Sequence, residues 1–267
     1  MTLATVGVVH PGAMGASVGD HLTDAGHRVI WASGGRSAET NSRAEAAGLI
    51  DVGSLAALVD HGDFIVSVCP PHAALQTATD IAKHGFSGIY LDANAIAPSA
   101  AEAISGIVTE AGASFVDGGI VGLPPVETGT TRLFLSGGDS ERVAELFEET
   151  LFDVVVIDDR VGSASALKTA FATWTKVSSA LLLSVEAYAD RTGVLPVLLE
   201  EWDRRFPHLG DRVELTRAAT GPKAWRFVGE MEQLATAMAD QDMPQGFHDA
   251  AGEIYQRLAA QNLPSAT

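Results

Sequence analysis

The chain has little of what several protein classes depend on. It contains one cysteine, Cys69, among 267 residues, so no disulfide can form within the chain. Basic residues are scarce: 17 Lys and Arg stand against 34 Asp and Glu, for a formal net charge of −17 at pH 7. Such an acidic surface repels phosphate backbones and argues against nucleic-acid binding. No apolar run is long enough to cross a bilayer, so we expect no membrane interaction. We also predict no metal site.

Aromatic residues make up only 6% of the chain, although 46% of it is hydrophobic. Its core must therefore consist mostly of Ala, Val, Leu and Ile. The length suffices for one large domain or two modest ones. The single thiol, together with an N-terminal segment that has no basic, signal-like region, favours a reducing cytoplasm.

The pattern of apolar residues divides the chain near residue 160. Before that point, short apolar runs alternate with helical segments, which predicts a parallel sheet covered by helices on both faces. From 163 to 189 runs one Ala-rich helical segment without Pro or Gly, and everything after it is helical in pattern. We therefore predict an α/β domain over 1–160 and an all-helical domain over 161–267, which begins with a long interdomain helix.

A glycine-containing loop joins the first predicted strand to the first predicted helix. It reads Gly7-Val-Val-His10-Pro-Gly12-Ala-Met-Gly15. Gly12 would let the backbone approach a pyrophosphate, and Gly15 would let the helix pack closely. His10 replaces the first glycine of the dinucleotide fingerprint, so an ordinary strand–helix turn is the alternative. From its context we predict a Rossmann pyrophosphate site, formed by His10, Pro11, Gly12, Ala13 and Met14.

The run after the second predicted strand, Trp31 to Ser37, contains no acidic residue. An NAD-specific domain usually has Asp or Glu there for the ribose 2′-hydroxyl. Ser33, Arg36 and Ser37 could instead hold a 2′-phosphate, Arg36 through charge-assisted hydrogen bonds. This pattern favours NADP(H) over NAD(H). A surface arginine at the start of a helix is the alternative interpretation of Arg36.

Two further strand ends are candidates for cofactor contacts, because ligands bind at the carboxyl edge of such sheets. Cys69 and Pro70 follow one apolar strand and are predicted to border the ribose or nicotinamide, with Cys69 acting as a small buried apolar group. Asn94 follows the next strand and offers both a donor and an acceptor. Cofactor binding and a local Asx turn explain Asn94 equally well.

Two later segments are candidates for the substrate side of the site. A Gly- and Pro-rich stretch over 117–125 predicts a tight loop that could wrap a substrate with backbone N–H groups, with Val121, Gly122 and Leu123 as candidate contacts. A plain loop without a ligand is the alternative. Lys168 stands in the first turns of the long helix, with apolar residues on its face. A partly desolvated lysine can serve as proton donor when a hydride passes to C=O or C=N. The alternative is a surface lysine on an interdomain helix.

Together these segments resemble the β-hydroxyacid dehydrogenase superfamily, which includes 3-hydroxyisobutyrate and 6-phosphogluconate dehydrogenases and the imine reductases. The resemblance follows the chain in order and spacing. The glycine loop matches the family's opening pattern, G-F-I-G-L-G-x-M-G. The other matching segments are Asp92-Ala-Asn94-Ala-Ile-Ala-Pro98 for D-x-S-T-x-x-P, Asp117-Gly-Gly-Ile-Val121-Gly122-Leu123 for D-A-P-V-S-G-G, and Gly162-Ser-Ala-Ser-Ala-Leu-Lys168 for the catalytic G-x-G-x-x-x-K.

The resemblance implies catalysis by Lys168 and a homodimer formed through the helical domain. It also makes Trp174, Trp225 and Glu230 candidate pocket residues, although helix packing would explain Trp225 equally well. The chain departs from the family pattern at the substrate-loop Ser, which is Val121, and at the Asn one turn after the lysine, which is Ala172. These departures argue against a 2-methyl-3-hydroxy acid held by the usual polar residues. The second half resembles a less-characterised branch of the superfamily with a shorter helical C-terminal domain.

Three functional hypotheses follow. The first is an NADP(H)-dependent oxidoreductase that acts on a small carbonyl or hydroxy-acid-like substrate, with Lys168 as proton donor or acceptor. The second is an imine reductase, because the missing Ser and Asn suit a less polar substrate. The third is a non-catalytic NADP-binding sensor, which Lys168 argues against. A methyltransferase also has a glycine loop after its first strand, but the missing acid after strand two ranks it low.

Overall fold

The computed structural model describes residues 3–262. The chain divides into two compact units, Met1–Lys168 and Thr169–Thr267. The division falls inside the helix that begins at Ser163, whereas the expected domain boundary near residue 160 precedes that helix. In the described part of the chain, no helix is long and apolar enough to span a bilayer.

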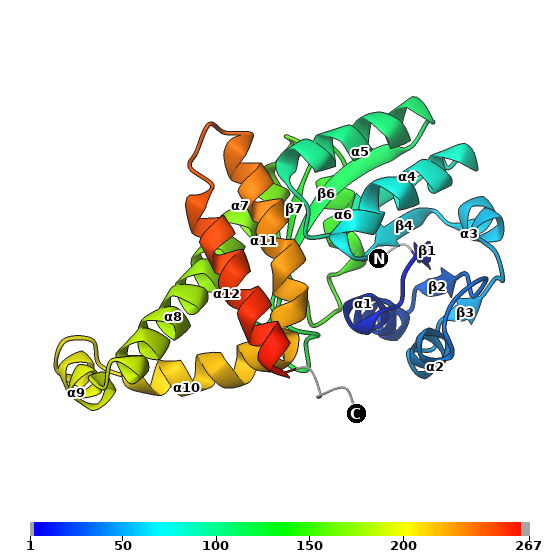
Figure 1. Ribbon diagram of the computed structural model, residues 1–267. Helices are drawn as coiled ribbons and strands as arrows, with labels where there is room; N and C mark the ends of the chain where they lie inside the picture. Colours follow the sequence, from blue (N-terminus) through cyan, green and yellow to red (C-terminus); the bar gives the residue numbers. More distant parts are fainter. Residues whose placement is uncertain (1–2, 263–267) are drawn as a thin grey trace. The chain divides into compact units, whose positions relative to one another are not determined.

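The first unit is built around one eight-stranded sheet with strand order β3-β2-β1-β4-β5-β6-β7-β8. Figure 1 labels β1 to β4, β6 and β7 of this sheet. This α/β arrangement confirms the predicted Rossmann-like fold. Its strands are β1 (Thr5–Val8), β2 (Arg28–Trp31), β3 (Ile50–Asp51), β4 (Phe64–Ser67), β5 (Ile89–Asp92), β6 (Ser114–Val121), β7 (Arg132–Ser136) and β8 (Asp153–Asp158).

Helices cover both faces of this sheet. One apolar cluster joins it to α1, α2 and α6, and a second cluster joins it to α3, α4 and α5. Strand side chains such as Val6 and Ile65 are fully buried, as expected for a sheet packed on two sides. The helices are α1 (Ala13–Asp24), α2 (Ala38–Ala46), α3 (Leu55–His61), the short η1 (Pro71–Ala73), α4 (Ala74–Lys83), α5 (Pro98–Glu110), α6 (Ser140–Leu146) and α7 (Ser163–Ala172).

Two predictions about this sheet were wrong. The sheet is not wholly parallel, because β7 runs antiparallel to β6 and β8 runs parallel to β7. The glycines after Asp117 do not form a loop but continue β6 as far as Val121. Gly118 is suited to this strand because a Cβ there would lie 2.9 Å from the Leu91 side chain. Of the three predicted substrate-loop residues, only Gly122 and Leu123 follow the strand.

The second unit contains no strand among its described residues, as predicted. The expected continuous helix from 163 to 189 is interrupted by a π-helical turn, η2 (Thr173–Val177). A small core around Met231, Leu234 and Tyr255 joins α11 to α12. The remaining helices are α8 (Ser178–Arg191), α9 (Leu195–Arg205), α10 (Leu209–Thr220), η3 (Gly221–Lys223), α11 (Ala224–Ala239) and α12 (Gly246–Asn262).

Candidate active site

The glycine loop lies at the carboxyl edge of the sheet, between β1 and α1. The Gly12 amide donates to the His10 carbonyl oxygen at 2.8 Å, which forms a tight turn. A Cβ on Gly15 would lie 2.2 Å from that same carbonyl oxygen, so the turn requires glycine at this position. A Cβ on Gly12 would meet nothing within 4 Å, and no side chain among the described residues caps the amino end of α1. The amino end of α1 is therefore open to an anion, as a pyrophosphate site requires.

Arg36 reaches back to this loop from the β2–α2 connection. Its Nη2 donates to the Val9 carbonyl oxygen at 3.3 Å. Its Nε and the Nδ1 of His10 are both buried, and neither has a hydrogen-bond partner among the described residues. Burial and, second, the charge of Arg36 lower the pKa of His10 to about 4. His10 is thus neutral at pH 7, and Arg36 is the cation beside the loop.

The run from Trp31 to Ser37 contains no acid, as the sequence shows, but an acid from a neighbouring strand lies beside it. Asp51 comes from β3, which pairs with β2 so that Trp31 lies opposite Asp51. Its Oδ1 accepts hydrogen bonds from the amides of Ser33 at 3.1 Å and Gly53 at 2.8 Å. A hydrogen bond from the Ser33 side chain is the main cause that lowers the pKa of Asp51. Ser33 is therefore already engaged by a carboxylate, which analysis of the strand-two sequence alone missed.

Ser37 and Asn94 both have structural partners. Ser37 caps α2, where its Oγ accepts from the Thr40 amide at 3.2 Å. Asn94 is buried and bridges two strand ends: its Oδ1 accepts from the Cys69 amide at 2.5 Å and its Nδ2 donates to the Ser67 Oγ at 3.1 Å. The side chain of Asn94 therefore fixes the Cys69–Pro70 segment, at the edge where the cofactor contacts were predicted.

Two titratable groups complete this edge of the sheet. Burial is the main cause that raises the pKa of Cys69, so the group is a thiol rather than a nucleophilic thiolate at neutral pH. Asp92 is almost fully buried, and burial raises its pKa to about 7. Its Oδ1 accepts from the Asn94 amide at 3.0 Å, so the local Asx turn is made by Asp92 and not by Asn94.

Lys168 lies against β6, close to the predicted substrate residues. Its Nζ donates a hydrogen bond to the carbonyl oxygen of Ile120, next to Val121. Burial lowers the pKa of Lys168. Leu123 is 69% exposed, and its carbonyl oxygen accepts from the Thr131 Oγ1. The structure thus brings the predicted proton donor together with the end of β6.

The three substrate candidates of the second unit differ in their surroundings. Trp174, in the π turn η2, is 71% exposed, and Trp225, at the start of α11, is 69% exposed. Glu230 forms an ion pair with Lys176, whose Nζ also lies 5.1 Å from the centre of the Phe227 ring. Their substrate contacts remain predictions.

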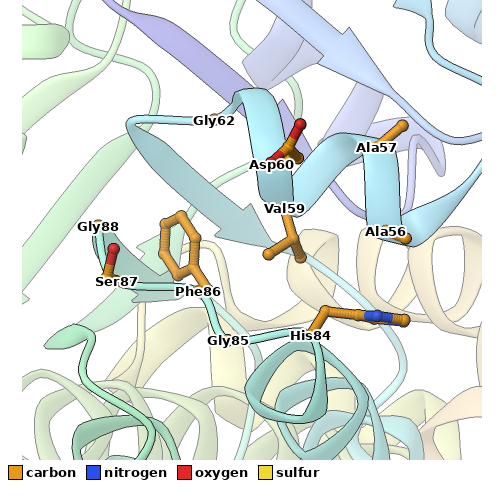
Figure 2. Close-up of a pocket in the computed structure, with 10 residues that line it drawn as sticks. All are labelled: Ala56, Ala57, Val59, Asp60, Gly62, His84, Gly85, Phe86, Ser87 and Gly88. Atoms are coloured by element: carbon orange, nitrogen blue, oxygen red, sulfur yellow. The ribbon is translucent and has the colours of Figure 1, made fainter.

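A cavity of about 540 Å³ lies elsewhere in the first unit. Figure 2 shows Val59 and Asp60 of α3 on one side of it, with His84 and Phe86 of the α4–β5 connection on the other. These residues stand at the amino ends of β4 and β5. The glycine loop, Cys69 and Asn94 are at the carboxyl ends, so this cavity is not the candidate site. In the described part of the chain, no group of three or more His, Cys, Asp and Glu side chains could hold a metal ion.

Two family models match the chain. The model described as the NAD binding domain of 6-phosphogluconate dehydrogenase matches residues 5–155. A domain of unknown function, DUF1932, matches residues 189–258. A curated relative, an uncharacterised 28.5 kDa protein of Methanothermus fervidus, is 30% identical over 166 residues. That match covers 62% of this chain and 63% of the relative's length.

Several solved structures share the fold at low sequence identity. A conserved protein of unknown function, described as structurally similar to 3-hydroxyacid dehydrogenases, has a TM-score of 0.78 and 24% identity, with 98% of this chain and 100% of that one covered. The 3-hydroxyisobutyrate dehydrogenase of Mycobacterium tuberculosis with L-serine has a TM-score of 0.77 and 16% identity, over 97% and 94%. A reductive aminase of Aspergillus terreus, in complex with an NADPH derivative, has a TM-score of 0.60 and 16% identity, over 98% and 95%.

Proposed function

Because the chain belongs to the 6-phosphogluconate dehydrogenase NAD-binding family, within the β-hydroxyacid dehydrogenase superfamily, we propose an NADP(H)-dependent hydride transfer to or from a small carbonyl or hydroxy-acid-like substrate. Membership in this family makes the chain a dinucleotide-dependent dehydrogenase or reductase. The preference for NADP(H), the role of Lys168 and the class of substrate are our proposal.

The observation that carries the proposal is the placement of Lys168. Its ammonium group is partly buried against β6 and bonded to a backbone carbonyl oxygen, that of Ile120. Burial lowers its pKa, so the amine gives up a proton more readily than an exposed lysine. When bound, the dinucleotide supplies or accepts the hydride. Lys168 then protonates the substrate oxygen during reduction, or takes the proton from the hydroxyl during oxidation.

The residues of the glycine loop fit a dinucleotide. Gly12 leaves open space in front of the amino end of α1, and Gly15 permits the tight turn that shapes it. The chain carries a net charge of −17, so an anionic cofactor needs local donors. The amides of α1 and the guanidinium of Arg36 provide them.

The proposed preference for NADP(H) rests on Arg36. Its buried Nε has no hydrogen-bond partner among the described residues, and a phosphate oxygen would supply one. Asp51 is the competing feature, since a carboxylate near a ribose favours the free 2′-hydroxyl of NAD(H). Fluorescence titration with NADPH and NADH tests this balance. We expect tighter binding of NADPH, and Arg36→Ala should remove the difference; equal binding by the unchanged protein would refute the preference, and binding of neither dinucleotide would refute the proposal.

Replacement of Lys168 tests the catalytic role. Lys168→Met should lower turnover by about 10²- to 10⁴-fold, the usual contribution of a positioned acid or base, and leave NADPH affinity unchanged. Lys83→Met is the matched control, because Lys83 is 63% exposed and lies at the end of α4. Turnover that survives in Lys168→Met would rule out this role.

A second candidate function is imine reduction. Val121 stands where the family has a serine, and Ala172 is buried where the family has an asparagine. Both changes suit a less polar substrate than a hydroxy acid. Rates on L-serine and 3-hydroxyisobutyrate, set against rates on a cyclic imine, separate the two functions. NADPH binding without turnover of any of these compounds would instead favour a non-catalytic sensor.

We also propose a homodimer formed through the second unit, with a small molecule rather than nucleic acid or a membrane as the other partner. Leu181, Val185 and Tyr188 follow each other at spacings of four and three along α8, so they share one helix face. They are 61%, 36% and 69% exposed. A row of large exposed apolar side chains on one helix face is typical of a subunit interface.

A further inference from the structure

Asp117, in the middle of β6, holds the first turn of α7. It is fully buried, and its carboxylate accepts three hydrogen bonds from two serines. The donors are the Ser165 amide at 2.8 Å, the Ser165 Oγ at 2.6 Å and the Ser136 Oγ at 3.2 Å. Ser136 in turn accepts from the Ala164 amide at 3.0 Å. Asp117 thus binds the Ser165 amide directly and the Ala164 amide through the Ser136 hydroxyl. Both amides belong to the amino end of α7.

The same strand contacts α7 again at Lys168. The Lys168 Nζ donates to the carbonyl oxygen of Ile120, three residues after Asp117 on β6. Ser165 and Lys168 are also three residues apart, so they lie on neighbouring positions of one helix face. Strand and helix therefore meet at two points.

Gly119 lies between these two contacts and allows the helix to approach. A Cβ there would lie 2.9 Å from the Ala164 carbonyl oxygen and 3.3 Å from the Lys168 Cβ. No larger residue could occupy this position without moving α7. The backbone of β6 therefore sets the depth at which Lys168 sits.

From this geometry we propose that Asp117 is a positioning residue for Lys168: through Ser165 it fixes the first turn of α7 on β6 and so holds the amine against Ile120. The proposal rests on the proposed function, because it gives Asp117 a catalytic consequence only if Lys168 moves a proton. A carboxylate is suited to the task, because negative charge is stabilised at the amino end of a helix. Asp117 itself would touch neither substrate nor cofactor.

Loss of this anchor should free the lysine. Without the Asp117 carboxylate, the Ser165 amide loses its partner; without the Ser165 hydroxyl, one of the two bonds from Ser165 to Asp117 is lost. In either case the first turn of α7 opens more easily. Lys168 would then spend more time in water, and its pKa would return toward the ordinary lysine value. If Asp117 only stabilised the fold, its loss would change the melting temperature and leave the pKa and the exposure of Lys168 unchanged.

Site-specific labelling measures that change without a substrate. The chain has four lysines, at 83, 168, 176 and 223. Trinitrobenzenesulfonate labelling followed by peptide mass spectrometry gives the rate at Lys168 relative to exposed Lys83. The reagent attacks only the neutral amine, so we compare the pH-independent rate constants taken from pH profiles of labelling. In Asp117→Asn and Ser165→Ala we expect their ratio to rise by about tenfold, the effect of losing one hydrogen bond to a charged group. The pH at which Lys168 reaches half its maximal labelling rate should rise as well.

Ser163→Ala is the matched control. Ser163 is also a buried serine of the first turn, but its hydroxyl bonds Asp158, outside β6, at 3.0 Å. Its labelling ratio should stay unchanged. An unchanged ratio in folded Ser165→Ala would overturn the positioning role, and Ser165→Ala decides the matter if Asp117→Asn does not fold.

The failure of this proposal is distinguishable from failure of the proposed function. If Lys168→Met keeps its turnover, the catalytic role fails whatever the labelling shows. If Lys168→Met loses turnover but the labelling ratio does not move in Ser165→Ala, only the positioning role fails. If both hold, turnover in Ser165→Ala should fall while NADPH affinity stays constant.

Discussion

The first unit has buried polar atoms without partners at the carboxyl edge of its sheet, whereas the second has a row of large exposed apolar side chains along α8. Among the described residues, His10 Nδ1, Arg36 Nε and Asp92 Oδ2 are buried and unpaired at the carboxyl edge of the sheet. In the second unit, Leu181, Tyr188 and other large apolar groups are mostly exposed. Unpaired polar atoms are satisfied by a ligand with donors and acceptors, and exposed apolar rows by another protein surface. The comparison therefore supports our proposals that the first unit binds the cofactor and that the second unit forms the dimer.

The largest expected effect concerns the apolar face of α8. Leu181→Glu should convert the dimer to a monomer, because burial of an unpaired charge in an apolar interface costs several kcal/mol. Light scattering during gel filtration measures the mass directly. Gln256→Glu, which adds a charge at an exposed position of α12, should leave the mass unchanged. If the protein without substitutions is itself a monomer, the proposed dimer is refuted.

Next in size is a pair of substitutions in the glycine loop. Gly15→Ala should lower the free energy of unfolding by about 1–3 kcal/mol, because its Cβ would meet backbone atoms that cannot give way. Gly12→Ala should leave the free energy of unfolding nearly unchanged but weaken NADPH binding by at least about tenfold, since its methyl group would enter the space proposed for the pyrophosphate. Urea unfolding and fluorescence titration check the two values. Equal effects of both substitutions on stability would contradict this assignment.

A smaller effect concerns pH and Asp92. Burial raises the pKa of Asp92 from 3.8 to about 7, so the folded protein keeps a proton that the unfolded chain has released. Between these two values the folded state binds more protons, and the contribution of Asp92 to the free energy of unfolding falls as pH rises. Asp92→Asn should remove this fall in the free energy of unfolding, because asparagine has no carboxyl group to titrate. Its stability relative to the unchanged protein should increase from pH 4 to pH 7 in urea unfolding, and a constant difference would show that Asp92 is not buried as described.

The smallest effect is expected for the ion pair of the second unit. The Lys176 and Glu230 side chains are each 23% exposed, so water still reaches the pair, and a solvent-screened ion pair contributes about 0–1 kcal/mol. Glu230→Gln should therefore change the free energy of unfolding by less than Gly15→Ala does. A loss of NADPH-dependent turnover in this variant, with stability unchanged, would support the predicted substrate role of Glu230.

Local patterns predicted much of the fold. Alternating apolar runs and helical segments predicted the α/β class, and the spacing of Gly12 and Gly15 predicted the turn before α1, which the structure contains. The sheet edge was harder to predict. Composition around Gly118 and Gly119 indicates a loop, yet these residues lie in β6. Glycine is needed at both positions because neighbouring strands and α7 approach too closely for a side chain.

Asp51 shows a second limit of sequence analysis. It belongs to a two-residue strand that has no pattern of its own, and only its pairing with β2 brings the carboxylate to Ser33. The π turn η2 is another case, because the Ala-rich segment has the spacing of an uninterrupted helix. In the structure, the Tyr255 hydroxyl of α12 donates to the Lys176 carbonyl oxygen within that turn at 2.6 Å.

By itself, the sequence determined which residue types this protein has available: Lys168 after the glycine-rich segment, Arg36 just after the second strand, and glycines where a backbone must turn or be approached. Tertiary structure decided what these residues face. Only the pairing of distant strands placed Asp51 beside Ser33, and only the packing of α7 on β6 placed Lys168 against Ile120 and Ser165 against Asp117. The reason is physical: periodicity is set by neighbours along the chain, whereas desolvation and hydrogen-bond partners are set by groups far away in sequence.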